Sequence, residues 1–470
     1  VGEIRLPVHS LNTLVVGSGA AARNAALQLL RRGVEDIAII TDKWNAGTSF
    51  NAGSDKQTYY KLALTGNPDS AGELARDLWA GRCMHGDIAL CEAQGSAEAF
   101  FNLVELGVPF PHDRFGGFLG YRTDNDGRGR ATSAGPLTSK LMCECLGEEL
   151  RRRKLRIFDG YQVVALLTRP AGEGDMKSPA SVCGVVAIDK GGLNDDDFGL
   201  VIFNARNVVL ATGGPGGLYR DSVYPQSQRG STGMALRAGA VAQNLTESQF
   251  GMASVAFRWN LSGSYQQVIP RYLSTEPDGS DEREFLNLHF PDMKTLASAI
   301  FRKGYEWPFD CQKVSGFGSS LVDLLVHGER ESGRRVFLDF TSNPQGGEGL
   351  EPFSLDCLDD EAKDYLQRSG ALRESPIQRL AALNQPSITL FRDHGIDLAK
   401  DRLEIAVCAQ HNNGGLGADL WWQSNLRNLF PIGEVCGTHG VRRPGGAALN
   451  AGQVGGFRAA QFIAAHCGEA

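Results

Sequence analysis

The chain has 470 residues, of which 42% are apolar and 21% charged, and its formal net charge is −7. This length corresponds to about three domain-sized units and allows a large buried core. The negative charge excludes a polyanion-binding surface, so we expect no nucleic-acid partner. No apolar run reaches the roughly 18 residues that span a bilayer, and the first ten residues lack the apolar core of a signal peptide.

The ten cysteines are scattered along the chain, without the spacing of a zinc or iron–sulfur site. We therefore predict no metal site, and free thiols in a reducing, cytoplasmic compartment. The 58 glycines are the unusual feature of the composition. They are not periodic and gather where loops are expected, which indicates backbone packed closely against a ligand.

Residues 11–43 give the clearest local pattern. An apolar run typical of a buried parallel strand leads into Gly17, Gly19 and Ala22, spaced as G-x-G-x-x-A. Apolar residues then recur at helical spacing, and a second buried strand closes with Asp42. In this order the glycines allow backbone to approach a pyrophosphate at a helix N-terminus, and the acid accepts hydrogen bonds from a ribose.

The sequence after residue 43 predicts a nucleotide-binding domain that is discontinuous along the chain. Strands expected at 155–167 and 182–189 form an antiparallel excursion before a second glycine-ended strand, "NARNVVLATGGPGGLY" at 204–219. Aromatic and mixed-charge residues then replace the glycine-rich strand ends until about 395, after which short apolar strands and glycine loops return. Residues 455–467 are expected to form a closing helix. We predict domain segments at 1–244, 245–395 and 396–470.

The motifs resemble those of the FAD-dependent succinate dehydrogenase/fumarate reductase flavoproteins, a family that includes L-aspartate oxidase and soluble fumarate reductases. The segments that carry the resemblance are "VVGSGAAA", "TSFNAGSDK", "VVLATGGPGGLY", "NLFPIGEVCG" and "HGVRRPGGAALNAG". The resemblance implies an α/β fold: a discontinuous Rossmann-like FAD-binding domain with an inserted α+β capping domain. Some members attach FAD to a histidine, but that position falls near Gly47 here, so we expect non-covalent FAD.

Carried over residue by residue, the resemblance implies a set of cofactor-binding positions. They lie at the pyrophosphate, the adenosine, the ribityl chain and the flavin ring. The set is Gly17, Ser18, Gly19, Ala21, Asp42, Lys43, Thr48, Ser49, Asn51, Ala52, Gly53, Val163, Ala211, Thr212, Gly213, Glu434, Ala448 and Leu449.

The resemblance also implies catalytic residues. Arg443 matches the arginine of the family's "HGANRLG"-like segment and would bind a substrate carboxylate, a bidentate task that suits guanidinium. In "AQHNNGG", the family's histidine falls on Gln410, and His411 takes the next position, either in the site or as a structural residue. The family's proton-donating arginine has no clean counterpart, and Arg271 is the nearest candidate, with Arg258 as another.

Two further stretches depart from the family or leave its pattern open. "SQFGMAS" has Gly251 and Ala253 where the family has "QFHPT", with its substrate-binding histidine and threonine. In the segment 121–135, the arginines form either a positive mouth of the substrate site or a solvated loop; they are Arg122, Arg128 and Arg130.

We therefore expect a soluble FAD-dependent oxidoreductase that dehydrogenates or reduces a small carboxylate-bearing substrate by hydride transfer at the flavin. The alternative is an electron-transfer flavoprotein subunit of a larger redox complex, without its own substrate pocket and with a partner protein. A nicotinamide-using enzyme is a third possibility, but a second complete G-x-G-x-x-G unit is absent from the sequence. The family's C-terminal helical domain has no counterpart here, which disfavours the usual docking on an iron–sulfur subunit.

Overall fold

The computed structural model describes residues 5–66, 68–124, 126–170 and 180–467. Its largest sheet has seven strands, with five parallel strands at its centre and one side and an antiparallel pair at the other edge. The parallel strands are β1 (Val8–Val16), β2 (Ile37–Thr41), β6 (Arg156–Asp159), β9 (Leu200–Leu210) and β17 (Leu429–Pro431). The antiparallel pair is β7 (Tyr161–Arg169) and β8 (Ser181–Asp189).

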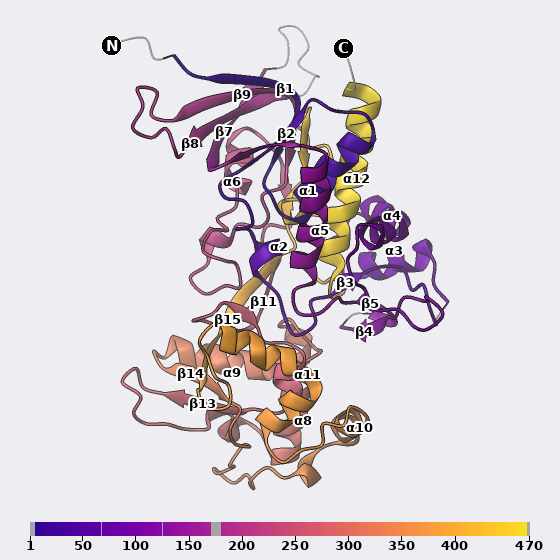
Figure 1. Ribbon diagram of the computed structural model, residues 1–470. Helices are drawn as coiled ribbons and strands as arrows, with labels where there is room; N and C mark the ends of the chain where they lie inside the picture. Colours follow the sequence, from indigo (N-terminus) through magenta and orange to yellow (C-terminus); the bar gives the residue numbers. More distant parts are fainter. Residues whose placement is uncertain (1–4, 67, 125, 171–179, 468–470) are drawn as a thin grey trace.

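Three helices pack together beside the parallel strands (Figure 1): α1 (Ala20–Arg31), α5 (Thr138–Arg152) and α12 (Ala447–Cys467). The predicted closing helix at 455–467 is the second half of α12, which begins eight residues earlier. Its interior glycines explain this length, because a Cβ at Gly452 would lie 3.2 Å from the Ala21 side chain and one at Gly456 3.1 Å from the Ala25 backbone. These glycines let two helices approach closely, rather than forming a loop.

The other elements of this part surround the helices and carry the loops of the site. They are α2 (Thr48–Asn51), α3 (Ala71–Trp79), α4 (Gly86–Glu105) and α6 (Thr232–Arg237), with β3 (Tyr59–Tyr60), β4 (Tyr121–Thr123), β5 (Asp126–Thr132), β10 (Ala242–Gln243) and β16 (Gly415–Leu416). Helix α4 packs against both α3 and α12. Among the described residues, no helix is both long and apolar enough to cross a membrane.

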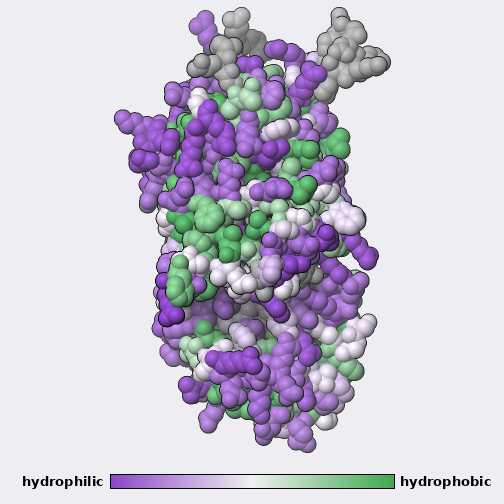
Figure 2. All heavy atoms as spheres, turned by 90° about the vertical axis from the view of Figure 1, so that its right-hand side faces the viewer, coloured by the Kyte–Doolittle hydropathy of each residue, from purple (hydrophilic) through white to green (hydrophobic). Residues whose placement is uncertain are grey.

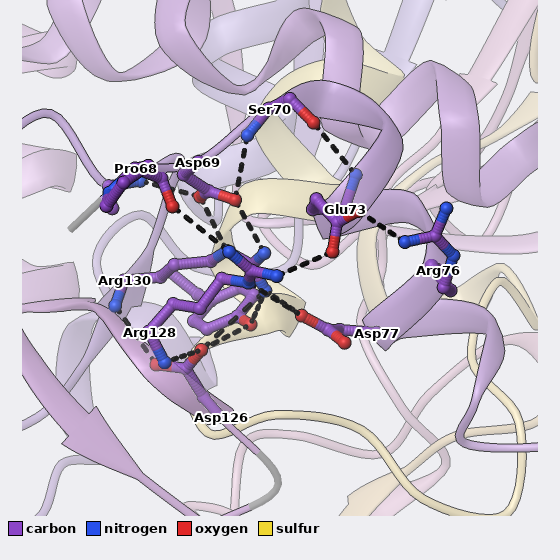
Figure 3. Close-up of polar contacts among 11 residues, drawn as sticks. Pro68, Asp69, Ser70, Glu73, Arg76, Asp77, Asp126, Arg128 and Arg130 are labelled. Carbon is purple, nitrogen blue, oxygen red and sulfur yellow. Dashed lines mark hydrogen bonds and ion pairs between the residues drawn. The ribbon is translucent and has the colours of Figure 1, made fainter.

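A buried ion network fastens β5 to the segment before α3 (Figure 3). The Arg130 side chain is fully buried and lies 2.7 Å from Asp69, 2.5 Å from Asp77 and 3.6 Å from Asp126. Burial alone would raise the pKa of Asp69, but the hydrogen bonds from Arg130 offset it and hold that pKa below its usual value. Arg128 pairs with Glu73 at 2.6 Å. Arg130 is therefore a structural residue, and neither reading predicted for it, a positive mouth or a solvated loop, is correct.

We expect Arg130→Met to lower the free energy of unfolding by about 3–5 kcal/mol, because it leaves buried carboxylates without their cation. The matched control is Arg76→Ala on the same network's surface, where the side chain is 67% exposed and pairs with Glu73. That change should cost at most about 1 kcal/mol. Urea unfolding of the FAD-loaded protein measures both, and equal costs would contradict the structural role of Arg130.

A second sheet of five strands forms the cap, which lies at the opposite end of the molecule from both termini (Figure 1). Its strands are β11 (Ser248–Ser254), β12 (Trp259–Asn260), β13 (Arg271–Thr275), β14 (Arg335–Asp339) and β15 (Leu403–Asn412). Its helices are α7 (Ser264–Gln267), α8 (Met293–Lys303), α9 (Ser319–Glu331), α10 (Asp360–Arg368) and α11 (Pro376–Asp393). Short 3-10 turns occur at Gly216–Leu218, Phe285–His289, Cys311–Lys313, Leu355–Cys357 and Gly433–Val435.

Strand β15 connects the two parts of the molecule. It pairs with β11 and β14 of the cap, although residues 403–412 lie beyond the predicted boundary at 395. We propose that the cap extends to Asn412, and the other boundaries remain predictions. Polar contacts also cross between the parts: Lys313 lies 2.7 Å from Asp124, Arg442 lies 3.0 Å from Asp310, and the backbone N–H of Ser264 donates to Asp55 at 3.0 Å.

Candidate functional site

An elongated cavity of about 770 Å³ extends from the carboxyl ends of β1 and β9 to the underside of the cap. Ligands of open α/β sheets bind at this edge of the sheet. All the predicted cofactor positions except Asn51 line this cavity. Asn51 lies outside it, because its exposed amide donates to the backbone oxygens of Asn45 and Gly47 at 2.8 and 3.0 Å.

The pyrophosphate end of the cavity is a backbone cradle. Gly17 has φ +110°, and a Cβ at that residue would overlap the carbonyl oxygen of Ala211 on the neighbouring strand. Gly19 is the N-cap of the 12-residue helix α1 and has no side chain to accept a hydrogen bond from the first turn. The first N–H groups of the helix and the positive end of its dipole therefore stay available at this end of the cavity. The Ala20 N–H alone is bonded to a side chain, the Ser49 hydroxyl at 3.3 Å. This arrangement fits a diphosphate.

At the end of the cavity predicted to hold the adenosine, one predicted cofactor residue forms an ion pair. Among the residues that the structure describes, no other predicted cofactor residue does so. Asp42 closes β2 and pairs with Lys190, which also donates to the backbone oxygen of Asp42 at 3.1 Å. Val163 lines this end from β7. The Thr212 backbone oxygen accepts from Gln228 at 2.6 Å. The acid after β2 therefore lines the cavity with Lys190 as its neighbour, and its role at a ribose stays a prediction.

The flavin end is formed by the late segments of the chain. Glu434 is partly buried and accepts from the Tyr224 hydroxyl and from the Asn412 N–H, the latter at 2.9 Å. Burial raises the pKa of Glu434, opposed by these hydrogen bonds and by the charge of Arg443. Ala448 and Leu449 lie in the first turn of α12, where the Leu449 N–H already donates to Gly446 at 3.2 Å. The Thr48 hydroxyl, from α2, also belongs to the cavity lining and is buried without a partner among the described residues.

Arg443 lies beside this end of the cavity with its hydrogen-bonding capacity largely unused. Its Nε is buried without a partner, and its Nη1 makes a long bond of 3.4 Å to the backbone oxygen of Pro444. Burial lowers the pKa of Arg443 to about 10, while Glu434, Tyr224 and Glu92 act in the opposite direction. The guanidinium therefore keeps its charge at neutral pH. A partly buried cation in this state is poorly compensated until an anion binds it.

His411 lines the cavity in a defined protonation state. The amide nitrogen of Asn413 donates to the backbone oxygens of Gly440 and Val441, at 2.8 and 3.3 Å, so its oxygen faces His411 Nδ1 at 3.1 Å as an acceptor. Nδ1 therefore carries the proton. Burial, followed by the charges of Arg443 and His439, lowers the pKa of His411 well below its usual value. His411 Nε2 is thus an unprotonated, buried acceptor without a partner among the described residues.

Two buried groups behind Arg443 were not predicted from the sequence. The His439 ring lies 5.8 Å from that of His411, and burial, then Arg443, lowers its pKa to about 3. Glu92 of α4 is fully buried near Thr438, with no hydrogen bond of ordinary geometry to either carboxyl oxygen. His439 opens the motif "HGVRRPGGAALNAG", which could have pointed to it, whereas Glu92 sits in an ordinary helical pattern that gives no signal.

Glu92 gives the protein a specific pH dependence. Burial raises its pKa to about 8 from 4.5, against the opposing effects of Thr438 and Arg443. Between these values the folded state holds a proton that the unfolded chain has released, so stability falls as the pH rises through this window. We expect Glu92→Gln to gain roughly 2–4 kcal/mol relative to the parent protein between pH 5 and pH 9.

Chemical unfolding at the two pH values measures this gain. Glu105→Gln is the control, because Glu105 ends the same helix and is exposed. Parallel stability profiles for the parent protein and Glu92→Gln would contradict the assignment of a buried, protonated Glu92.

The remaining predicted arginines lie elsewhere. Arg271 does not line the cavity, because β13 places it in the cap sheet, where it pairs with Glu284. Arg258 donates to the backbone oxygen of Tyr224 at 3.0 Å and is likewise outside the cavity. Arg122 is exposed and lines the cavity on the side of the FAD-binding part. The structure therefore brings together Arg443 and His411, but not Arg271.

Comparisons with known proteins agree with this geometry. A family model described as FAD binding domain matches residues 12–270. One subunit of the fumarate reductase (CoM/CoB) of Methanothermobacter marburgensis is 23% identical over 462 residues, covering 96% of this chain and 72% of the relative. L-aspartate oxidase 2 of Ralstonia nicotianae is 25% identical over 471 residues, covering 98% and 73%. The structure of a mutant of E. coli quinol fumarate reductase FrdA superposes with a TM-score of 0.67 at 19% identity, covering 99% and 72%.

Proposed function

Because the chain belongs to the FAD binding domain family and is an FAD-dependent oxidoreductase, we propose that it oxidises or reduces a small organic acid at the flavin. The observation that carries this proposal is the partly buried side chain of Arg443, which lines the cavity and whose buried Nε has no partner among the described residues. A substrate carboxylate would form charge-assisted, bidentate hydrogen bonds with it. Such a contact fixes the adjacent carbon relative to the cofactor.

His411 supplies the proton chemistry in this proposal. Dehydrogenation of a C–C or C–N bond removes a hydride from one atom and a proton from the other. His411 lines the cavity and its buried Nε2 has no partner among the described residues, so in this proposal it would accept that proton, and in the reverse direction it would return it. The bound carboxylate would offset the positive charge of Arg443, which is one cause of the depressed pKa of His411. Substrate binding would therefore make the imidazole a stronger base.

FAD would supply the hydride acceptor or donor when bound. We propose that it is held without a covalent bond, because Gly47, at the position expected for attachment, has no side chain to form one. The cradle at Gly17 and the N-terminus of α1 would hold the diphosphate, and Glu434 would lie at the ribityl chain. A cytoplasmic location is part of the proposal, since the ten cysteines, all within the described residues, are free thiols.

A second function, electron transfer to a partner protein, is favoured by the surface. On the face shown in Figure 2, hydrophobic residues gather over the FAD-binding part, while the cap is mostly hydrophilic. Exposed large apolar side chains of this part include Trp79, Phe101 and Phe115, which are 59%, 42% and 81% exposed. Exposed apolar patches of this kind serve as contact surfaces for partners. The convergence of Arg443 and His411 on the cavity nevertheless supports a substrate site in this chain.

The proposal is tested by reducing the bound flavin without oxygen and screening unsaturated acids and imino acids for reoxidation. We expect carboxylate-bearing acceptors to reoxidise the flavin and their uncharged amides to fail. The amides are matched controls that differ only in the group expected at Arg443. Reoxidation by a partner protein alone, with no response to any acid, would favour the electron-transfer function.

A further inference from the structure

The cap contributes part of the cavity lining, and its lining residues before β15 carry no charge. Eight residues of 245–395, a range that the structure describes in full, line the cavity. They are Asn260, Ser262, Gly263, Gln267, Gly304, Tyr305, Trp307 and Tyr365. None is acidic or basic, so a second carboxylate of a substrate would find no cation on this part of the lining.

Both tyrosines of this lining have hydrogen-bonded hydroxyl groups. The Tyr305 hydroxyl donates to Glu361 at 2.5 Å, and the Tyr365 hydroxyl donates to Gln267 at 3.0 Å. With both hydroxyls bonded, these residues contribute mainly ring carbons to the cavity. Gly263 and Gly304 contribute only backbone, and the space beside them is already filled, since a Cβ would overlap the Asp55 side chain at Gly263 and lie 2.5 Å from that of Gln267 at Gly304. The lining from the cap therefore combines three aromatic side chains with neutral polar ones.

Trp307 completes this surface because residue 251 is glycine. A Cβ at Gly251 would lie 2.5 Å from the indole Nε1 of Trp307 and 2.9 Å from the adjoining ring carbon, so any side chain there would displace the indole. The Gly251 backbone oxygen accepts from the Gln410 amide at 2.9 Å. Gln410 also lines the cavity, so the end of the site beside Trp307 holds a neutral amide and an indole.

The acidic groups beside this lining already have partners. Asp124 is already paired with Lys313, and Asp55 accepts hydrogen bonds from Ser264 and Asn384 where the cap meets the FAD-binding part. The other cations at this end, Lys56 and Arg122, are exposed and come from the FAD-binding part. A substrate with one carboxylate and a neutral, flat remainder suits the uncharged residues and the aromatic side chains of this lining.

We infer that the substrate is an aryl-bearing monocarboxylate, held by Arg443 at its carboxylate and by Trp307, Tyr305 and Tyr365 at its ring, with Trp307 as the specificity-determining residue. This inference rests on the proposed function, since it assumes a carboxylate at Arg443. Stacking against aromatic rings adds affinity beyond the apolar area buried. A dicarboxylate of similar length would place its second charge against this uncharged lining.

The test is a titration of the FAD-loaded protein with cinnamate, crotonate and fumarate, following the perturbation of the flavin absorbance. We expect cinnamate to bind at least tenfold more tightly than either crotonate or fumarate. Trp307→Ala should weaken cinnamate binding about tenfold and crotonate binding less than twofold. The control Trp79→Ala, at a side chain 59% exposed on α3, should change neither.

A second variant guards against a folding defect in Trp307→Ala. Gly251→Ala should displace the indole and weaken cinnamate selectively, while FAD content and melting temperature report the integrity of both variants. Tighter binding of fumarate than of cinnamate, with loss of fumarate binding in Arg122→Ala, would overturn the inference and leave the proposed function intact. Absence of binding by all three acids would overturn both.

Discussion

Replacing Arg443 by glutamine is expected to lower kcat/KM for the carboxylate substrate by about 10²–10³-fold while FAD remains bound. The reason is that the Arg443 side chain is partly buried in the cavity lining, with its Nε unpartnered among the described residues, and we propose the substrate carboxylate as its counter-ion. Removing one partner of a desolvated charge pair leaves the other charge uncompensated, which costs about 2–5 kcal/mol. Steady-state kinetics with the acid identified in the reoxidation screen measure the loss.

The adjacent arginine provides the control for this prediction. Arg442 is partly exposed and pairs with Asp310 of the cap at 3.0 Å. Arg442→Gln removes the same charge from the same motif and should change kcat/KM by no more than about fivefold, the cost of a partly exposed ion pair. Equal losses in the two variants would show that the net charge of the motif matters, and not a carboxylate contact at Arg443.

Replacing Gly17 by alanine is expected to abolish FAD retention during purification. The residue has φ +110°, and its added methyl group would overlap the Ala211 carbonyl oxygen, at the point where β1 and β9 end side by side. Either the strand ends separate or the turn before α1 shifts, and both changes move backbone N–H groups away from the diphosphate. The ratio of flavin absorbance to protein absorbance measures the loss.

Gly33→Ala separates this effect from simple backbone strain. Gly33 follows α1 with φ +81°, but nothing lies within 4 Å of an added Cβ. Both substitutions therefore carry a similar left-handed backbone cost of about 1–2 kcal/mol, and only one has the overlap. Full flavin content in Gly17→Ala, or equal loss in both variants, would contradict the proposed cradle.

Local pattern was sufficient for the cofactor half of the molecule. The apolar run before Gly17, the helical spacing after it and the acid at Asp42 are all carried by neighbouring residues. The resulting β1–α1–β2 unit matches the predicted order of elements, with β1 and β2 parallel and adjacent. The predicted closing helix was too short, because its glycines have the composition of a loop and form a helix only through their packing against α1.

The catalytic half depended on contacts between distant segments. Arg130 was grouped with its neighbouring arginines in either a positive mouth or a solvated loop, but its buried position is set by Asp69 and Asp77, more than 50 residues away. Arg271 was the nearest arginine to a missing motif, yet strand pairing in the cap directs it toward Glu284. Glu92 shows no signal at all, because its unusual pKa arises only when α4 is buried behind Arg443.

By itself, the sequence determined the FAD-binding half and the position of Arg443, because short glycine motifs and strand–helix order encode a backbone cradle locally. Tertiary structure decided which side chains share the cavity with that arginine. The β11–β15 pairing and the loop after α8 bring Gly251, Gln410 and Trp307 together from three separate segments. The charge and shape of the cavity lining depend on which side chains share one small volume, and spacing along the chain does not specify that.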